Sequence, residues 1–221
     1  MKVLVTDPIA EAGIERIREQ GHEVQKDYNL SGEELLDAVV DVNAMIVRSG
    51  TEVTREVLEA AEEMVIVGRA GIGVDNIDIE AATDNGVIVA NAPEGNVRAA
   101  AEHTVAMAFA TARSIPQAHE RLSEGEWAKG EFLGTEVNDK TLGIVGFGRV
   151  GQEVAKRLSN LGMELIVFDP YISEERAEQL GAELVDDLND CLRRADFVTI
   201  HTPLTSETEN MIGEEELAQL E

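Results

Sequence analysis

Short runs of aliphatic and β-branched residues alternate with helical patterns along nearly the whole sequence, and this alternation constrains the fold more than any other feature. Strands that alternate with helices in this way are typical of βαβ units, in which the strands form a parallel sheet. Early strands are expected at residues 2–6, 23–25, 44–48, 65–69 and 87–90. Aromatic residues make up only 4% of the chain, so we expect a core of Val, Ile, Leu and Ala. The sequence therefore predicts the α/β class.

The pattern changes in the middle of the chain. Residues 97–111 are rich in alanine and broadly apolar, which predicts a long helix with few exposed positions. A polar stretch follows at residues 113–140, and a second series of strands begins near Thr141, with strands expected at residues 142–145, 164–168, 183–185 and 197–200. We therefore expect two domains, residues 1–97 and 98–221, with the long helix as the bridge between them.

A few residues indicate where helices begin and end. Ser31 followed by Glu34 has the spacing of a capping box, which predicts a helix start at Ser31. Gly21 and Gly86 stand where a helix should stop and a strand begin, because glycine readily adopts the left-handed conformation found after a helix C-terminus. The last helix is expected at residues 214–221.

The motif GxGxxG occurs at residues 146–151 as Gly-Phe-Gly-Arg-Val-Gly. Alone it is a weak signal, but here an apolar strand precedes it and an amphipathic helix follows it, which is the context of a dinucleotide-binding turn. In such a turn Gly146 allows the tight bend, Gly148 lets the backbone approach the pyrophosphate, and Gly151 lets the helix pack closely on the strand. The N–H groups at the start of the helix then face the phosphates.

Asp169 follows the next predicted strand and indicates which dinucleotide binds. A carboxylate at this place can accept hydrogen bonds from the ribose hydroxyls of the adenosine, and it would repel the 2′-phosphate of NADP. The residues that follow, Pro170, Tyr171 and Ile172, offer no arginine to receive that phosphate. We therefore expect NAD as the cofactor.

The charge of the chain is strongly negative. It contains 44 acidic and 18 basic residues, giving a formal net charge of −26, and the acids are scattered rather than gathered in one tail. Such a surface repels phosphate backbones, which argues against nucleic acid as a partner. Self-repulsion of this size needs screening, and the Debye length falls to about 3 Å at 1 M salt. We therefore expect a halophilic protein.

Membrane and export signals are not found in the sequence. No apolar run approaches the roughly 18 residues of a membrane span, and the N-terminus lacks a signal-peptide pattern. The lone Cys191 cannot form an internal disulfide, which fits a reducing compartment. A cytoplasmic protein without a membrane partner is expected.

Five further segments accompany the GxGxxG motif in a fixed order. They are Val-Arg-Ser-Gly-Thr at residues 47–51, Gly-Arg-Ala-Gly-Ile-Gly-Val-Asp-Asn-Ile-Asp at 68–78, Asn-Ala-Pro-Glu-Gly-Asn at 91–96, Ala-Ala-Glu-His-Thr at 100–104 and His-Thr-Pro-Leu at 201–204. With these segments, the whole chain resembles the D-isomer-specific 2-hydroxyacid dehydrogenases, and most of all those that act on D-3-phosphoglycerate. The resemblance implies a flavodoxin-like substrate-domain part followed by an incomplete Rossmann NAD-binding domain.

The resemblance also implies roles for single residues. It implies that the substrate is bound by Arg48, Ser49, Gly71, Ile72, Gly73 and Asn96. It implies that the cofactor is bound by Thr104, Gly146, Gly148, Arg149, Val150, Gly151, Asp169, Thr202 and Pro203. A guanidinium fork suits a carboxylate or a phosphate, which fits Arg48 at the end of a predicted strand. The alternative roles are a surface salt bridge for Arg48 and an ordinary strand-to-helix turn for residues 71–73.

The implied activity is NAD-dependent oxidation of D-3-phosphoglycerate to 3-phosphohydroxypyruvate in serine biosynthesis, by a homodimer. In that family the catalytic histidine, glutamate and arginine lie after the segment that matches residues 201–204, so we expect none of them in these 221 residues and an inactive fragment. His103 and His201 are therefore given no catalytic role, and no metal is expected. Two alternatives stay open: a dehydrogenase for another small D-2-hydroxy acid such as glyoxylate, and a non-catalytic NAD-binding interaction module.

Overall fold

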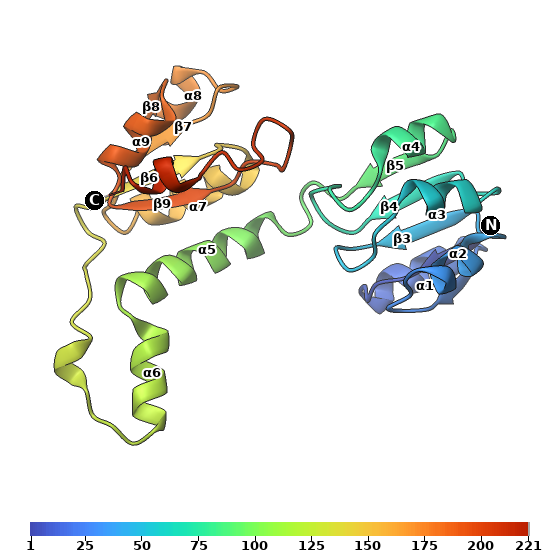
Figure 1. Cartoon of the computed structure of the whole chain (residues 1–221), viewed down its shortest axis with the longest axis horizontal. Helices are drawn as coiled ribbons and strands as arrows, with labels where there is room; N and C mark the ends of the chain where they lie inside the picture. The colour runs from blue at the N-terminus through green and yellow to red at the C-terminus, as the bar shows by residue number, and fades with distance from the viewer. Residues whose placement is uncertain (221) are drawn as a thin grey trace. The chain divides into compact units, whose positions relative to one another are not determined.

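The computed structural model describes residues 1–220 of the chain. These residues divide into two compact units, which we call the first unit, Met1–Asn96, and the second unit, Val97–Glu221. Each unit contains one parallel sheet with helices packed on it (Figure 1). Both sheets and their helices confirm the α/β class.

The sheet of the first unit has the strand order β2-β1-β3-β4-β5, and all neighbouring strands are parallel. This is the flavodoxin-like order of doubly wound folds. Its strands are β1 (Lys2–Val5), β2 (Glu23–Lys26), β3 (Ala44–Val47), β4 (Ile66–Arg69) and β5 (Ile88–Asn91). Its helices are α1 (Glu11–Glu19), α2 (Glu33–Val39), α3 (Arg55–Ala60) and α4 (Ile79–Asp84).

Helices cover the two faces of this sheet because successive strand side chains point to opposite sides. Leu4 and Met45 belong to the larger cluster, which includes buried residues of α2, α3 and α4. Val3, Val5 and Ala44 belong to the opposite cluster, against which the partly buried residues of α1 pack. The aliphatic strands therefore build a core on both faces, and their carboxyl ends are left free for loops.

The predicted helix ends are partly confirmed. Gly21 and Gly86 have φ of +84° and +69° and follow helices, as expected. The capping box at Ser31 is wrong, because α2 begins at Glu33 with Gly32 as the residue before it and without a side-chain cap. Gly32 takes a positive φ of 54°, and its carbonyl oxygen already accepts hydrogen bonds from the backbone N–H groups of Leu35 and Leu36. The helix therefore starts after Gly32 and not at Ser31.

The sheet of the second unit has the order β8-β7-β6-β9, again with parallel neighbours. Counted from β6, this is the order 3-2-1-4 of a Rossmann fold, whose ligands bind where the strand order reverses, here between β6 and β9. Its strands are β6 (Thr141–Val145), β7 (Glu164–Phe168), β8 (Ala182–Val185) and β9 (Phe197–Ile200). Its other elements are α5 (Val97–Ala112), α6 (Ile115–Ser123), η1 (Lys129–Glu131), α7 (Arg149–Ser159), α8 (Glu174–Glu178), α9 (Leu188–Arg194) and α10 (Glu214–Leu217).

The core of this unit also lies on both faces of its sheet. One cluster joins α7 to strand residues such as Leu142 and Val167. The other joins Ile166 and Val185 to Cys191, which is fully buried. Burial raises the pKa of the Cys191 thiol to about 11, so it remains protonated at neutral pH. This cysteine is a packing residue.

The long helix α5 differs from its prediction. Only Ala101 and Ala112 are buried among its residues, and Met107 is 51% exposed. The expectation of few exposed positions is wrong. Helix α5 packs mainly against α7, and this contact leaves most residues of α5 unburied. The polar stretch that follows is not a plain loop, since it contains α6 and η1. Its Trp127 is 79% exposed. None of the helices within residues 1–220 is long and apolar enough to cross a bilayer.

Candidate functional site

A glycine-rich turn connects β6 to α7 in the second unit. Gly146 has φ of +91°, and a Cβ placed on it would lie 2.8 Å from the backbone nitrogen of Thr202. A Cβ on Gly151 would overlap the carbonyl oxygen of Gly146. A Cβ on Gly148, in contrast, would meet no atom within 4 Å. Gly146 and Gly151 are therefore required by the fold, whereas the open space at Gly148 is room for a ligand to approach the backbone.

Asp169 connects the end of β7 to this turn. One carboxylate oxygen accepts a hydrogen bond from the backbone N–H of Phe147 at 2.6 Å. The other accepts one from the backbone N–H of Tyr171 at 2.9 Å. Each oxygen keeps a further lone pair for a ligand. Asp169 therefore has a structural role in the turn as well as the predicted role toward a ribose.

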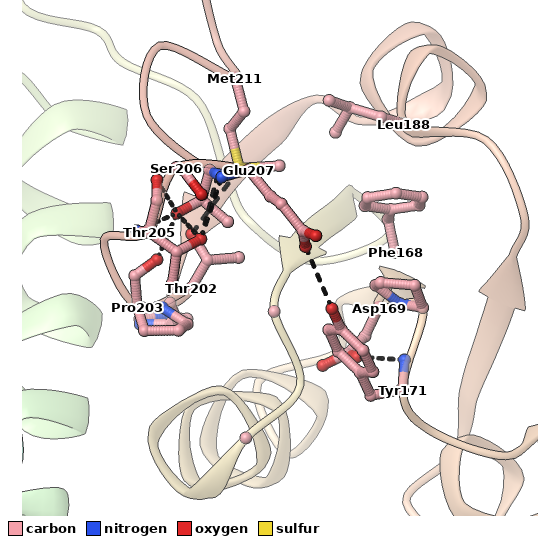
Figure 2. Close-up of a pocket in the computed structure, with 15 residues that line it drawn as sticks. Phe168, Asp169, Tyr171, Leu188, Thr202, Pro203, Thr205, Ser206, Glu207 and Met211 are labelled. Carbon is pink, nitrogen blue, oxygen red and sulfur yellow. Dashed lines mark hydrogen bonds between the residues drawn. The ribbon is translucent and has the colours of Figure 1, made fainter.

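A cavity of about 770 Å³ opens at the carboxyl ends of β6, β7 and β9. This volume suits a large organic ligand, since ligand pockets span about 300–1,000 Å³. Its lining residues are Gly146, Gly148, Phe168, Asp169, Pro170, Tyr171, Leu188, His201, Thr202, Pro203, Thr205, Ser206, Glu207, Thr208 and Met211 (Figure 2). The cavity lies where a doubly wound sheet binds its ligand.

One wall of the cavity comes from the loop between β9 and α10, residues 201–213, which we call the β9–α10 loop. The Thr208 hydroxyl holds this loop in shape, because it accepts a hydrogen bond from the backbone N–H of Thr205 at 2.8 Å and donates one to the carbonyl of Pro203. Glu207 of this loop points toward Tyr171, whose hydroxyl donates to its carboxylate at 3.3 Å (Figure 2). The charge of Glu207 raises the pKa of Tyr171, which therefore remains a neutral donor.

His201 also lines the cavity, at the start of the β9–α10 loop. Its ring nitrogen Nε2 lies 2.9 Å from the hydroxyl of Thr199. Burial lowers the pKa of His201, so the imidazole is neutral at pH 7. The residue adds no positive charge to the cavity at that pH.

The structure gathers only some of the predicted cofactor residues around the cavity. Gly146, Gly148, Asp169, Thr202 and Pro203 line it. The remaining ones lie outside its lining: Arg149, Val150 and Gly151 in the first turn of α7, and Thr104 on α5, where its hydroxyl donates to the carbonyl of Ala100.

The sequence prediction missed Tyr171 and Glu207. Tyr171 lies two residues after Asp169, and this nearness in the sequence is the signal that could have found it. No pattern in the sequence indicates that Glu207 faces it, since the two residues are 36 positions apart.

The predicted substrate residues belong to the first unit. Arg48 and Ser49 directly follow β3, and Gly71, Ile72 and Gly73 follow β4, so both groups lie at the carboxyl edge of the sheet. The backbone N–H of Arg48 donates to the carboxylate of Asp7 at 2.7 Å, which holds the loop after β3 against the loop after β1. Asn96 is exposed and is the last residue of this unit.

Asn76, which the sequence alone does not single out, joins these two loops. Its side chain is 6% exposed, and its amide nitrogen donates to the carbonyls of Arg48 and Thr51 at 2.7 and 2.6 Å. Its amide oxygen accepts from the Nε of Arg69 at 2.8 Å. Two of these bonds go to the loop after β3 and the third to the last residue of β4, so this buried amide fixes the loop relative to the strand end.

Comparison with known proteins decides the family. The family model described as "D-isomer specific 2-hydroxyacid dehydrogenase, NAD binding domain" matches residues 105–221, which is more than half of the chain. The chain belongs to this family.

Individual relatives agree with this assignment. The chain is 50% identical over 218 residues to a D-3-phosphoglycerate dehydrogenase of Methanocaldococcus jannaschii, covering 99% of this chain and 41% of the relative. It is 49% identical over 213 residues to a D-3-phosphoglycerate dehydrogenase of Archaeoglobus fulgidus, covering 96% of this chain and 40% of the relative. The chain thus spans about two fifths of the length of these relatives.

A solved structure shows the same fold. The NAD⁺-bound 3-phosphoglycerate dehydrogenase of Entamoeba histolytica is 33% identical, with a TM-score of 0.81, over 100% of this chain and 68% of that chain. The predicted likeness to the D-isomer-specific 2-hydroxyacid dehydrogenases is therefore confirmed.

The residues of this 2-hydroxyacid dehydrogenase chain fit its family's cofactor. The tight turn at Gly146 and the open space at Gly148 leave room for a pyrophosphate beside the backbone at the start of α7, where helix N–H groups favour an anion. When bound, a nicotinamide dinucleotide supplies the group that accepts or donates a hydride. The residues of the chain would hold its phosphates at the glycine turn and its adenosine beside Asp169.

Proposed function

We propose that the protein carrying this chain oxidises D-3-phosphoglycerate to 3-phosphohydroxypyruvate with NAD, a step of serine biosynthesis. The observation that carries the proposal is the 50% identity, over 99% of the chain, to a relative named D-3-phosphoglycerate dehydrogenase. The similarity extends through the first unit as well, where the substrate residues were predicted.

Each unit has its own part in this proposal. The first unit would belong to the substrate domain, and the second unit would be the NAD-binding domain. Arg48, Ser49, Gly71, Ile72, Gly73 and Asn96 would face the substrate, with the Arg48 guanidinium suited to its anionic groups. Thr104, Gly146, Gly148, Arg149, Val150, Gly151, Asp169, Thr202 and Pro203 would face the cofactor, and Asp169 would favour NAD over NADP.

We also propose that the protein works as a homodimer in a reducing cytoplasm. Large apolar side chains on α5 and α6 support a dimer, since Met107, Ile115 and Leu122 are each at least 51% exposed. Where exposed apolar groups gather in one patch, they are typical of a surface that a partner covers. Light scattering after size-exclusion chromatography tests this, and a monomer at micromolar concentration would contradict it.

The activity is tested by following NADH formation at 340 nm with D-3-phosphoglycerate, glycolate and D-lactate as separate substrates. The protein is purified from its source cells, and its intact mass is measured so that the assayed length is known. We expect kcat/KM for D-3-phosphoglycerate to exceed the other two values by at least about 100-fold, since a site built to hydrogen-bond a polar group can discriminate by about 10⁴–10⁵-fold. A preference for glycolate or lactate, or NAD binding without turnover of any of them, would contradict the proposal.

A further inference from the structure

Two carboxylates face the same cavity from opposite walls. Asp169 lies at the end of β7, and Glu207 lies on the β9–α10 loop. Between them is Tyr171, whose backbone N–H donates to Asp169 at 2.9 Å and whose hydroxyl donates to Glu207 at 3.3 Å (Figure 2). Tyr171 therefore connects the two acidic groups through separate hydrogen bonds.

The two carboxylates are not equivalent. Both oxygens of Asp169 already accept backbone N–H groups, from Phe147 and Tyr171, which neutralises part of its charge toward the cavity. Glu207 is exposed and accepts one hydrogen bond, from an uncharged phenol. Its negative charge is therefore the less compensated of the two.

No cation balances this charge among the residues that line the cavity. The lining contains neither lysine nor arginine within the part of the chain that the structure describes. Its single histidine, His201, is neutral at pH 7 because burial lowers its pKa. The side chains that carry a charge at pH 7 in the described lining, Asp169 and Glu207, are therefore both acidic.

We propose that Glu207, held toward the cavity by Tyr171, is a second determinant of NAD preference over NADP, in addition to Asp169. The inference rests on the proposed function in one respect, namely that a nicotinamide dinucleotide occupies this cavity. NADP differs from NAD by a 2′-phosphate that carries up to two negative charges, and like charges placed close together disfavour binding. Glu207 adds a repulsion for the phosphate that NAD does not experience.

Tyr171 has a positioning role in this proposal. A glutamate on an exposed loop has several rotamers, and a hydrogen bond from Tyr171 favours those that keep the carboxylate at the cavity. Without the hydroxyl, Glu207 spends more time in bulk water, where its effect on the phosphate is screened. Tyr171→Phe should therefore shift selectivity in the same direction as loss of Glu207, but by less.

The test is a comparison of dissociation constants for NAD and NADP, measured by titration calorimetry in 0.1 M salt on the full chain. Glu207→Gln removes the charge and keeps the shape. Glu209→Gln is the matched control, because Glu209 is an exposed glutamate of the same loop that does not line the cavity. We expect Glu207→Gln to lower the ratio of Kd for NADP to Kd for NAD by about 3- to 5-fold, the scale of one screened charge pair near a surface. The ratio for Glu209→Gln should stay within about 1.5-fold of the parent ratio.

Salt provides a second readout. The Debye length falls from about 10 Å at 0.1 M to about 3 Å at 1 M, so the difference between parent and Glu207→Gln should shrink at 1 M. An unchanged ratio for Glu207→Gln, or equal shifts for both variants, would overturn the role of Glu207 and leave the proposed function standing. Absence of NAD binding by the protein purified from its source cells would overturn both the proposed function and this inference.

Discussion

At the scale of single residues, the glycines of the turn after β6 differ in what surrounds them. The nearest neighbours of a Cβ on Gly146 or Gly151 are backbone atoms, which cannot easily move away from an added methyl group. Gly148 has φ of −68°, a value open to any residue, and free space beside it. The motif therefore contains two glycines that the fold requires and one, Gly148, that it does not.

This difference predicts opposite effects of two alanine substitutions. Gly151→Ala should lower the free energy of unfolding by about 1–3 kcal/mol, the usual result of overpacking. Gly148→Ala should change it by less than about 1 kcal/mol but weaken NAD binding by about tenfold or more, because the methyl group fills the space for the pyrophosphate. Urea unfolding and NAD titration of both variants measure these effects. Equal destabilisation by the two substitutions would show that the space at Gly148 is not free.

The pH dependence of stability provides a second prediction at this scale. Burial lowers the pKa of His201 in the folded protein below its ordinary value of 6.5. As the pH falls below about 6.5, the unfolded chain takes up a proton at this residue before the folded chain does. The contribution of His201 is therefore complete above that pH and is lost as the pH falls toward the folded pKa. His201→Gln should lose less stability than the parent between pH 8 and pH 5.5 in urea unfolding, and parallel losses would contradict the prediction.

At the scale of elements, periodicity predicted the strands well, whereas the start of one helix and the burial of another were predicted wrongly. The capping box at Ser31 met its spacing rule, yet α2 begins at Glu33, directly after Gly32, whose backbone takes a positive φ. The apolar composition of α5 predicted burial, yet only two of its residues are buried, and its main contact is with α7. The local sequence determines which conformation a segment prefers, whereas tertiary contacts determine how much of its surface is buried.

The connection between β3 and β4 through Asn76 is testable at this scale. Asn76→Ala would leave the carbonyl of Thr51, in a buried bond, and that of Arg48, in a partly buried one, without these donors. A buried unsatisfied group costs about 1–3 kcal/mol. We expect the free energy of unfolding of the first unit to fall by about 2–4 kcal/mol, with NAD affinity unchanged because the cavity lies in the second unit. The control is Asn160→Ala, which removes an exposed bond to the carbonyl of Lys156 and should cost less than about 1 kcal/mol. Similar losses in both variants would contradict a special role for Asn76.

At the scale of the whole molecule, the net charge of −26 dominates. Several ion pairs involve arginine, such as Arg194 with Glu183 and Asp190, but 18 basic residues cannot balance 44 acidic ones. Exposed pairs of this kind contribute little to stability. Repulsion among the remaining carboxylates acts on the folded chain more than on the expanded one, because folding brings them closer together.

Stability should therefore rise with salt. Between 0.1 and 2 M KCl we expect an increase of at least about 4 °C in Tm, which corresponds to roughly 1–2 kcal/mol for a chain of this size. Sucrose at matched osmolality is the control, since it is excluded from protein surfaces without screening charge. Differential scanning calorimetry measures both series. A Tm that is highest at low salt, or a rise that sucrose reproduces, would remove the case for halophilic adaptation.

The sequence by itself determined the order of strands and helices, the glycine turn with Asp169 after the next strand, and the family resemblance. These features depend on local periodicity and on the fixed geometry of a strand, a turn and a helix. Only the tertiary structure decided that Asn76 donates to Arg48 and Thr51 and that Glu207 faces Tyr171 across the cavity. Such contacts join residues tens of positions apart, and they form because parallel strands bring their carboxyl ends, with the loops that follow, to one edge of a sheet.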